Sequence, residues 1–142
     1  MQASNRTAEK IQEVTQVAKL LKVLADPTRL RILHLLITTK EEICVCEFVD
    51  SLHERQYNVS KHVAVLEGAG FIKGKKDGRF TYYRFLSDRG VAGEVALVGF
   101  LAAALQQDQQ CLADIERFSA RLACRVGGRC RIGVQSKQLA SE

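Results

Sequence analysis

The segment from Asp26 to Phe85 most constrains the fold, because it joins three helical patterns to a hairpin through short polar links. Asp26 suits a helix N-cap and Pro27 its first position, so a helix is predicted from there to about Thr38. After the break TTKEE, the patterns ICVCEFVDSL (43–52) and YNVSKHVAVLEGAG (57–70) predict two more helices, separated by HERQ. Two helices joined by so short a link form a helix-turn-helix.

A β-hairpin is predicted directly after these helices. Gly68 and Gly70 end the last helix, and FIKGKKDGRFTYYRF (71–85) predicts two short strands around Asp77-Gly78, a dipeptide suited to a tight turn. Such a hairpin beside a helix-turn-helix is called a wing. We therefore expect a mainly α fold with a small β-hairpin, that is, a winged helix-turn-helix.

Apolar residues at spacings of three and four predict a helix at each side of this module, from Thr7 to Leu24 and from about Asp88 through Ile115. The long apolar stripe of the second helix exceeds what a domain of this size covers by itself. We expect the N-terminal helix and this long C-terminal helix to pair as a homodimer, with packing inside one chain as the alternative. The expected organisation is one dimerising winged-helix domain over residues 1–118 and a basic, cysteine-containing extension over residues 119–142.

Positive charge is concentrated in the helix-turn-helix and the wing. Residues 53–84 hold seven Lys and Arg against three acidic residues, whereas residues 85–116 hold one against five. If the last helix buries Val59, Val63 and Leu66, its opposite face suits the major groove of double-stranded operator DNA, and the basic wing suits the flanking backbone. A protein-binding winged helix is the alternative, and the basic wing favours DNA. The predicted DNA contacts are Gln56, Asn58, Ser60, Lys61, His62, Lys75, Lys76 and Arg79.

We expect a cytoplasmic protein without a membrane partner. Residues 95–105, the longest apolar stretch, are too short to span a membrane, and the polar N-terminal residues do not resemble a signal peptide.

Cysteines are the candidate ligands for a metal or metalloid. In a reducing compartment, five cysteines indicate thiol chemistry or metal binding rather than disulfides. Cys44 and Cys46 begin a predicted helix, whose N-terminus is expected to lower thiol pKa values. Both sulfurs can reach one ion only if that first turn is distorted; buried core cysteines are the alternative.

The motifs DPTRLRIL (26–33), ICVCEF (43–48), QYNVSKHVAVLEGAGFI (56–72) and GRFTYYR (78–84) together resemble the ArsR/SmtB family of metal-sensing repressors. The resemblance covers roughly residues 17–86. It implies a homodimeric repressor of a resistance operon that dissociates from operator DNA when thiolates bind As(III) or Sb(III). The C-V-C pattern also resembles sensors of Cd(II) and Pb(II). No organic cofactor is implied.

Two departures from the family pattern leave the third ligand open. Val49 stands where the arsenic sensors place a further cysteine. The cadmium sensors take further cysteines from a segment before the C-V-C pair, whereas no cysteine precedes Cys44 in this chain. The third sulfur must come from elsewhere, or binding is two-coordinate. We favour Cys130, because the glycines before it allow the tail to fold back, with Cys124 as the alternative and Cys111 as a packing residue. A family-type zinc site on the long helix is not expected, because residues 85–142 lack histidine.

Two rival functions use the same cysteines. Cys111 and Arg117 have the spacing of a cysteine-nucleophile enzyme, but the intervening LADIE lacks glycine, and its acidic residues would repel an oxyanion, so we expect no enzyme. A repressor on the same fold that senses oxidants or persulfides through its cysteines remains open. His34, inside the apolar LRILHLL, is expected to be a core residue rather than a ligand.

Overall fold

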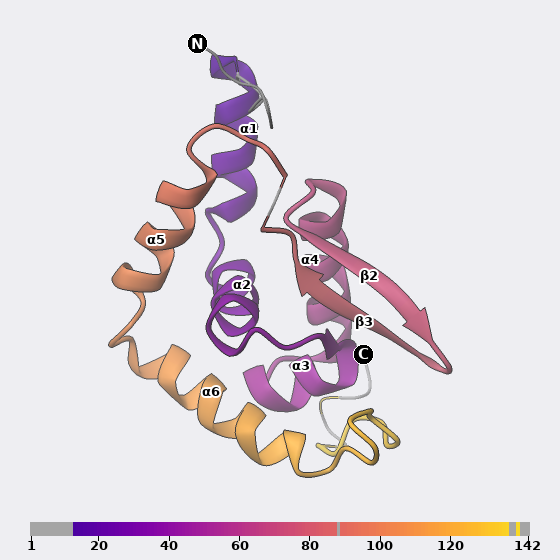
Figure 1. Cartoon of the computed structure of the whole chain (residues 1–142). Helices are drawn as coiled ribbons and strands as arrows, with labels where there is room; N and C mark the ends of the chain where they lie inside the picture. The colour runs from indigo at the N-terminus through magenta and orange to yellow at the C-terminus, as the bar shows by residue number, and fades with distance from the viewer. Residues whose placement is uncertain (1–12, 88, 137–138, 140–142) are drawn as a thin grey trace.

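The computed structural model describes residues 13–87, 89–136 and 139 and confirms the winged helix-turn-helix (Figure 1). The predicted start of the first helix at Thr7 lies outside the described residues. None of the helices in these ranges is long and apolar enough to cross a membrane. The elements are α1 (Val14–Leu24), α2 (Pro27–Thr39), β1 (Ile43–Cys44), α3 (Val45–Leu52), α4 (Gln56–Gly68), β2 (Ile72–Asp77), β3 (Phe80–Phe85), α5 (Glu94–Ala104) and α6 (Gln109–Leu122).

Helix α2 lies at the centre of the fold and packs against α4, α5 and α6. Its start follows the prediction, because the Asp26 side chain accepts a hydrogen bond of 3.1 Å from the Arg29 backbone N–H. Each apolar side chain buried here contributes about 1.5–3 kcal/mol to folding. The predicted inner face of α4 is confirmed, and His34 is buried as expected, within 3.3 Å of the Thr38 hydroxyl. The main core includes Ile32, Leu33, Leu35, Leu36, Phe48, Val59, Val63, Leu66 and Phe71.

A third strand extends the predicted hairpin. The sheet has the order β1-β3-β2 with antiparallel pairing, and β1 places Ile43 opposite Tyr83 and Cys44 opposite Tyr82. The prediction of a helix beginning at Ile43 is therefore wrong by two residues. Pairing with the wing satisfies the backbone here in the extended form, and α3 begins only at Val45.

The predicted single long C-terminal helix is also wrong, because the structure divides it into α5 and α6. Leu105 ends α5, and Asp108 caps α6 by accepting a hydrogen bond of 2.9 Å from the Cys111 backbone N–H. The break lets α5 pack on α2 while α6 turns beneath α3 (Figure 1). α6 continues through the predicted boundary at residue 118 to Leu122.

A buried ion pair joins α2 to α6. Both side chains are almost fully enclosed, with Arg31 7% and Asp114 1% exposed, and the guanidinium donates two hydrogen bonds of 2.9 and 2.8 Å to the carboxylate. Removing one partner of such a pair leaves an uncompensated buried charge. The pair thus fixes the orientation of α6, and with it the residues that follow α6.

Replacing Asp114 by alanine is expected to lower the free energy of unfolding by about 3 kcal/mol, because the buried Arg31 then keeps only its longer contact of 3.4 Å to Glu54. Urea denaturation followed by circular dichroism measures this change. Arg117→Ala is the matched control: Arg117 bonds the same carboxylate at 3.1 Å but is 35% exposed, so its loss should cost less. Equal effects of the two substitutions would contradict the assignment of Arg31–Asp114 as the main clamp.

Candidate thiolate centre and nucleic-acid interface

Cys44 and Cys46 come together at the junction between β1 and α3. Cys44 ends the strand and is the N-cap of the helix, with extended backbone angles of φ −91° and ψ 165°. Cys46 lies in the first turn of α3. Because only Cys46 has helical geometry, the two side chains converge, and their sulfur atoms lie 3.2 Å apart. The strand-to-helix junction thus supplies the distorted first turn that two sulfurs need in order to reach one ion.

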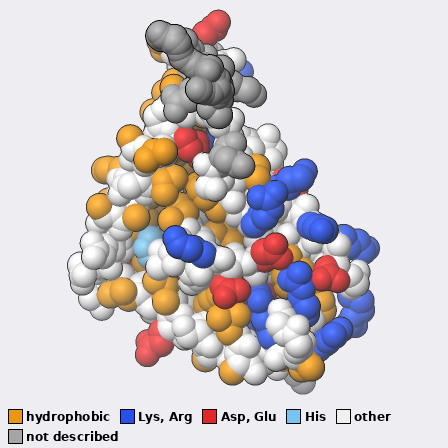
Figure 2. Space-filling view, in the orientation of Figure 1, with side chains coloured by type: hydrophobic (Ala, Val, Ile, Leu, Met, Phe, Trp, Pro, Cys, Tyr) orange, Lys and Arg blue, Asp and Glu red, His pale blue; other side chains and the backbone are white. Residues whose placement is uncertain are grey.

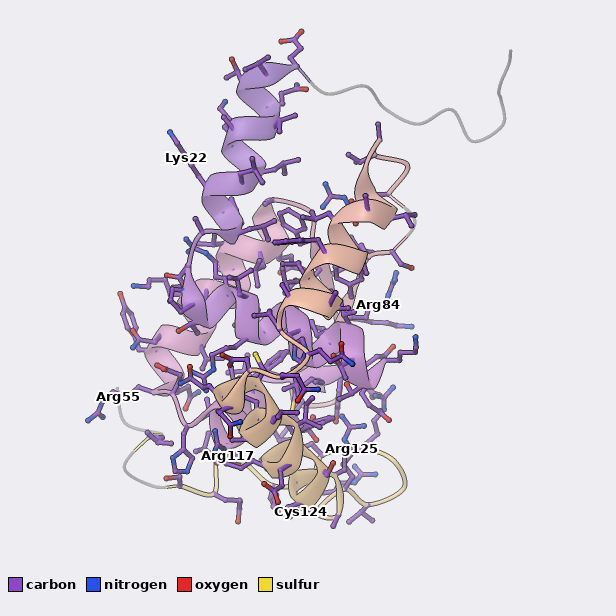
Figure 3. All side chains as sticks on the ribbon, turned by 90° about the vertical axis from the view of Figure 1, so that its left-hand side faces the viewer. Lys22, Arg55, Arg84, Arg117, Cys124 and Arg125 are labelled. Carbon is purple, nitrogen blue, oxygen red and sulfur yellow. The ribbon has the colours of Figure 1, made fainter. Side chains whose placement is uncertain are left out.

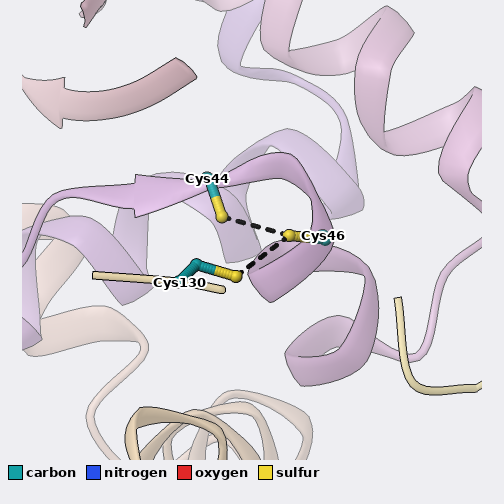
Figure 4. Close-up of side chains that lie close together, drawn as sticks. All are labelled: Cys44, Cys46 and Cys130. Atoms are coloured by element: carbon teal, nitrogen blue, oxygen red, sulfur yellow. Dashed lines mark hydrogen bonds between the residues drawn. The ribbon is translucent and has the colours of Figure 1, made fainter. Parts of the chain in front are cut away.

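Cys130 reaches this pair from the C-terminal loop, which we define as residues 123–136. Gly127 and Gly128 have positive φ angles of 62° and 78°, a conformation that favours glycine, and the resulting turn folds the loop back. The Cys130 backbone N–H donates to the Tyr82 hydroxyl at 2.8 Å, and the Cys130 sulfur lies 3.5 Å from that of Cys46 (Figure 4). All three sulfurs lie within 4.8 Å of one another and belong to buried residues.

The other two cysteines are placed away from this cluster. Cys124 is exposed just beyond the end of α6 (Figure 3). Cys111 is buried in α6, in line with a packing role, and burial and the nearby Asp108 raise its pKa to about 12. Of the two predicted candidates for a third sulfur, the structure brings Cys130 to the pair and leaves Cys124 outside.

Two ion pairs hold the C-terminal region against α3. Arg125 donates to both carboxylate oxygens of the fully buried Glu47, at 2.7 and 2.9 Å, and Glu47 also accepts from the Cys44 backbone N–H. Arg121 donates to Asp50 at 2.7 Å and to the Gly133 carbonyl at 3.0 Å. Arg125 also lies 3.5 Å from the Glu41 carboxylate, so the two arginines face three carboxylates and add no net positive charge beside the sulfurs.

Sequence reasoning missed these arginines, although a signal was present. Arg117, Arg121 and Arg125 recur every fourth residue, which places them on one side of a helix. In the structure all three contact α3 or its N-cap, and Arg117 donates to the Ser51 carbonyl at 2.7 Å. This arginine row explains why the loop after α6 lies beside the cysteines.

The expectation of a lowered thiol pKa is wrong for Cys44. The hydrogen bond with the Cys46 thiol, burial and the nearby Glu47 carboxylate together raise the pKa of Cys44 well above its usual value. These effects outweigh the helix N-terminus, because the site is enclosed and already holds a negative charge. Burial opposes the charge of Arg121, but its hydrogen bonds to Asp50 and Cys130 raise its pKa overall.

The predicted DNA contacts lie on α4 and the wing. Gln56, Ser60 and Lys61 are exposed on α4 and Asn58 is half-buried, while Lys75, Lys76 and Arg79 are exposed on the hairpin. Figure 2 shows Lys and Arg side chains gathered on this side of the molecule.

His62 differs from the other predicted contacts. It is half-buried and lies between α4 and the start of α2. Its Nδ1 accepts a hydrogen bond of 3.2 Å from Arg29, and its Nε2 lies 3.9 Å from the Asp26 carboxylate. Burial lowers the pKa of His62, although Asp26 acts in the opposite direction. These internal contacts suit a role in joining the two helices.

A cavity of about 430 Å³ connects the cysteines with this surface. Its lining includes Cys44 and Cys46 on one side and Gln56, Arg79 and Val134 on the others. The cluster, although buried, therefore borders a space between α4, the wing and the C-terminal loop through which a small ion can enter.

Comparisons with known proteins agree with this architecture. An uncharacterized HTH-type transcriptional regulator of Methanocaldococcus jannaschii is 35% identical over 79 residues, which are 56% of this chain and 88% of that protein. An arsenic resistance transcriptional regulator of Pseudomonas putida is 33% identical over 118 residues, 80% of this chain and 91% of the relative. The solved structure of reduced HlyU from Vibrio cholerae has a TM-score of 0.55 at 26% identity, covering 66% and 92% of the two chains.

These relatives are transcriptional regulators rather than enzymes, which confirms the expectation against an enzyme. The model of the arsR family of bacterial regulatory proteins matches residues 26–73, from the start of α2 into β2. That segment contains the whole helix-turn-helix as well as Cys44 and Cys46. From this match, the relative aligned over 91% of its length and the shared fold, we conclude that the chain belongs to the arsR family of bacterial regulatory proteins.

Proposed function

We propose that this chain is a metalloid-responsive repressor that binds operator DNA as a homodimer and dissociates when Cys44, Cys46 and Cys130 capture As(III) or Sb(III). The observation that carries the proposal is the convergence of three buried sulfurs from distant parts of the chain on one point. Soft thiolates favour soft ions. Because the cluster lies between the helix-turn-helix and the wing, ion binding there can change the positions of both.

The spacing of the sulfurs supports one shared ion. Sulfurs bound to one ion through bonds of about 2.3 Å lie about 3.3–3.8 Å apart. The observed separations are 3.2 Å between Cys44 and Cys46 and 3.5 Å between Cys46 and Cys130. Binding therefore requires little movement of these two pairs. The Cys44 and Cys46 thiols border the cavity, which provides access from solvent.

Charge favours a trivalent ion over a divalent one. Three thiolates neutralise As(III) or Sb(III), whereas they leave one negative charge with Cd(II) or Pb(II). Arg121 donates to the Cys130 sulfur at 3.6 Å, but its charge already faces Asp50, and that of Arg125 faces Glu47 and Glu41, so an additional buried negative charge would be only partly compensated. A buried uncompensated charge is costly. The enclosed site thus suits the neutral metalloid complex.

Release of DNA follows from the position of the cluster between two DNA-contacting elements. Cys44 pairs with Tyr82 of β3, and the Tyr82 hydroxyl accepts from the Cys130 backbone. α3 is joined to α4 by only three residues, among them His53 in a left-handed conformation. Closing the third pair of sulfurs, Cys44 and Cys130, around an ion would shift β1 and with it α3, and these shifts would pass to the wing and to α4. Ion and DNA would then weaken each other's binding equally.

Exposed apolar residues on α1 and α5 support the homodimer. Val14 is 87% and Val95 83% exposed, and Leu21 and Phe100 are also exposed large apolar residues. Figure 2 shows apolar side chains along this part of the surface. A second copy would cover them and would place two α4 helices on one operator.

Titration of an operator complex tests the proposed function. Fluorescence anisotropy of labelled operator DNA, in a phosphine reductant and without competing thiols, reports release as arsenite, antimonite, Cd(II) or Pb(II) is added. We expect release at the lowest concentration with arsenite or antimonite. Operator binding that withstands all four ions would contradict the proposal, and release by the divalent ions alone would exclude the metalloid assignment.

Residues of α4 and of the wing are expected to respond differently to substitution. Lys76→Ala should weaken binding to all sequences and lower the slope of log K against log salt by about 1, because Lys76 supplies one positive charge to a phosphate. Asn58→Ala should instead relax the preference at one base position, at a cost of about 1–3 kcal/mol. Competition binding with single-base operator variants measures both. An unchanged base preference in Asn58→Ala would show that Asn58 does not contact a base.

Thiol oxidation is a second candidate trigger. The sulfurs of Cys46 and Cys130 lie 3.5 Å apart, so an oxidant could join them. Operator release by peroxide that persists in the presence of a metal chelator, combined with no response to arsenite in reduced protein, would favour this function over the metalloid.

A further inference from the structure

The C-terminal loop contacts the tip of the wing as well as the cysteines. Arg129 Nε lies 3.0 Å from a carboxylate oxygen of Asp77, the last residue of β2. The Arg79 guanidinium donates to the Arg131 carbonyl at 3.5 Å, and Arg129 lies 4.3 Å over the ring of Tyr82. Residues on both sides of Cys130 are therefore attached to the hairpin, and the loop and the wing tip form one continuous surface.

The C-terminal loop makes the charge of the wing tip more positive. Asp77 is the only acidic residue between positions 71 and 86 and stands next to Lys75 and Lys76, where its carboxylate would repel a phosphate. Arg129 compensates that carboxylate. Arg131 is exposed, and its guanidinium forms no ion pair within the described part of the chain. The loop thus removes an unfavourable charge from the wing tip and adds a favourable one beside it.

We propose that Arg129 and Arg131 extend the wing and that this extension contacts the phosphate backbone of operator DNA, so that the loop supplying Cys130 is also a DNA-binding element. The proposal rests on the proposed function in taking duplex DNA as the partner. Arg131 contacts phosphate directly, while Arg129 acts by masking Asp77. Such contacts add affinity without base preference.

This arrangement gives the third cysteine a specific role. Cys130 lies between the two arginines, and its thiol donates to the Ile132 carbonyl at 2.8 Å. On arsenite capture the thiol proton leaves with one hydroxide as water, which removes that hydrogen bond, and the sulfur is drawn toward Cys44. The backbone of residues 129–131 then moves relative to the wing, and the same step withdraws Arg131 from the phosphate backbone.

Salt-dependent binding of the full-length, reduced, ion-free protein to operator DNA tests the role of Arg131. Arg131→Ala should lower the slope of log K against log salt by about 1, the value expected for one phosphate, which is about an eightfold loss of affinity at 0.1 M salt. Lys22→Ala removes the same charge from α1, far from the loop (Figure 3), and should leave the slope unchanged. A wild-type slope for Arg131→Ala, with a reduced slope for Lys76→Ala, would overturn the extension while leaving the proposed function intact.

A double-substitution cycle tests the masking of Asp77. Arg129→Ala alone should weaken DNA binding several-fold because the Asp77 carboxylate becomes free. Adding Asp77→Asn to Arg129→Ala should restore most of this affinity. Arg129 also pairs with Glu42 at 3.2 Å, so an effect that Asp77→Asn does not reverse would assign Arg129 to holding the loop and would overturn the masking role. Absence of salt-dependent operator binding in the wild type would instead refute the proposed function.

Discussion

A repressor carrying Cys130→Ser is expected to bind operator DNA normally and to stay bound at arsenite concentrations that release the wild type. Serine keeps the shape of the side chain but replaces the soft sulfur by a hydroxyl, a poor ligand for soft ions. Loss of groups that merely orient metal ligands costs about 10- to 100-fold in affinity. Loss of one of three ligands should therefore raise the arsenite concentration for half-release by more than about 100-fold.

Cys124→Ser is the matched control for this experiment. Cys124 lies six residues earlier in the same loop but is exposed, outside the sulfur cluster. Its variant should release DNA at the wild-type arsenite concentration. Circular dichroism and operator affinity without arsenite show whether each variant is folded. If Cys124→Ser abolished the response and Cys130→Ser retained it, the third ligand would be misassigned. A wild-type response in both variants would indicate two-coordinate binding by Cys44 and Cys46.

The second large effect concerns pH. The raised pKa of Cys44 means that this thiol keeps its proton in the ion-free protein at neutral pH. Cd(II) must displace that proton into water, so lowering the pH should weaken Cd(II) binding by about tenfold per pH unit for this thiol alone. Arsenite is present as As(OH)3, and each thiol proton leaves with one hydroxide as water, so no proton is released. Arsenite affinity should therefore stay nearly constant between about pH 6 and pH 8.

Isothermal titration calorimetry in two buffers of different ionisation enthalpy counts the released protons directly. We expect at least one proton per Cd(II) and none per arsenite. Cys124→Ser again serves as the control and should match the wild type with both ions. Proton uptake on arsenite binding, or an affinity for Cd(II) that does not change with pH, would show that the Cys44 thiol is already ionised.

Local patterns were sufficient to predict most of the fold. The Asp26-Pro27 start of α2, the inner face of α4 and the Asp77-Gly78 hairpin depend on capping, periodicity and turn geometry, each of which acts over a few residues. One wrong prediction involves partners far along the chain: residues 43 and 44 form a strand because the wing pairs with them. The break between α5 and α6 had a local signal in the polar residues 106–108 and the Asp108 cap, which the apolar residues on either side of it outweighed in the prediction.

For the candidate site, the sequence by itself determined the chemistry, and the tertiary structure decided the geometry. Two cysteines at the start of a helix, a third after paired glycines and a basic hairpin are visible in the residues alone. That Cys130 meets Cys46 across 84 residues, and that Cys44 is a buried thiol with a raised pKa, depends on contacts that no local pattern encodes. The ion pairs of Arg121 and Arg125 with α3 hold the C-terminal loop beside the cysteines. Only the folded chain brings these charges within bonding distance.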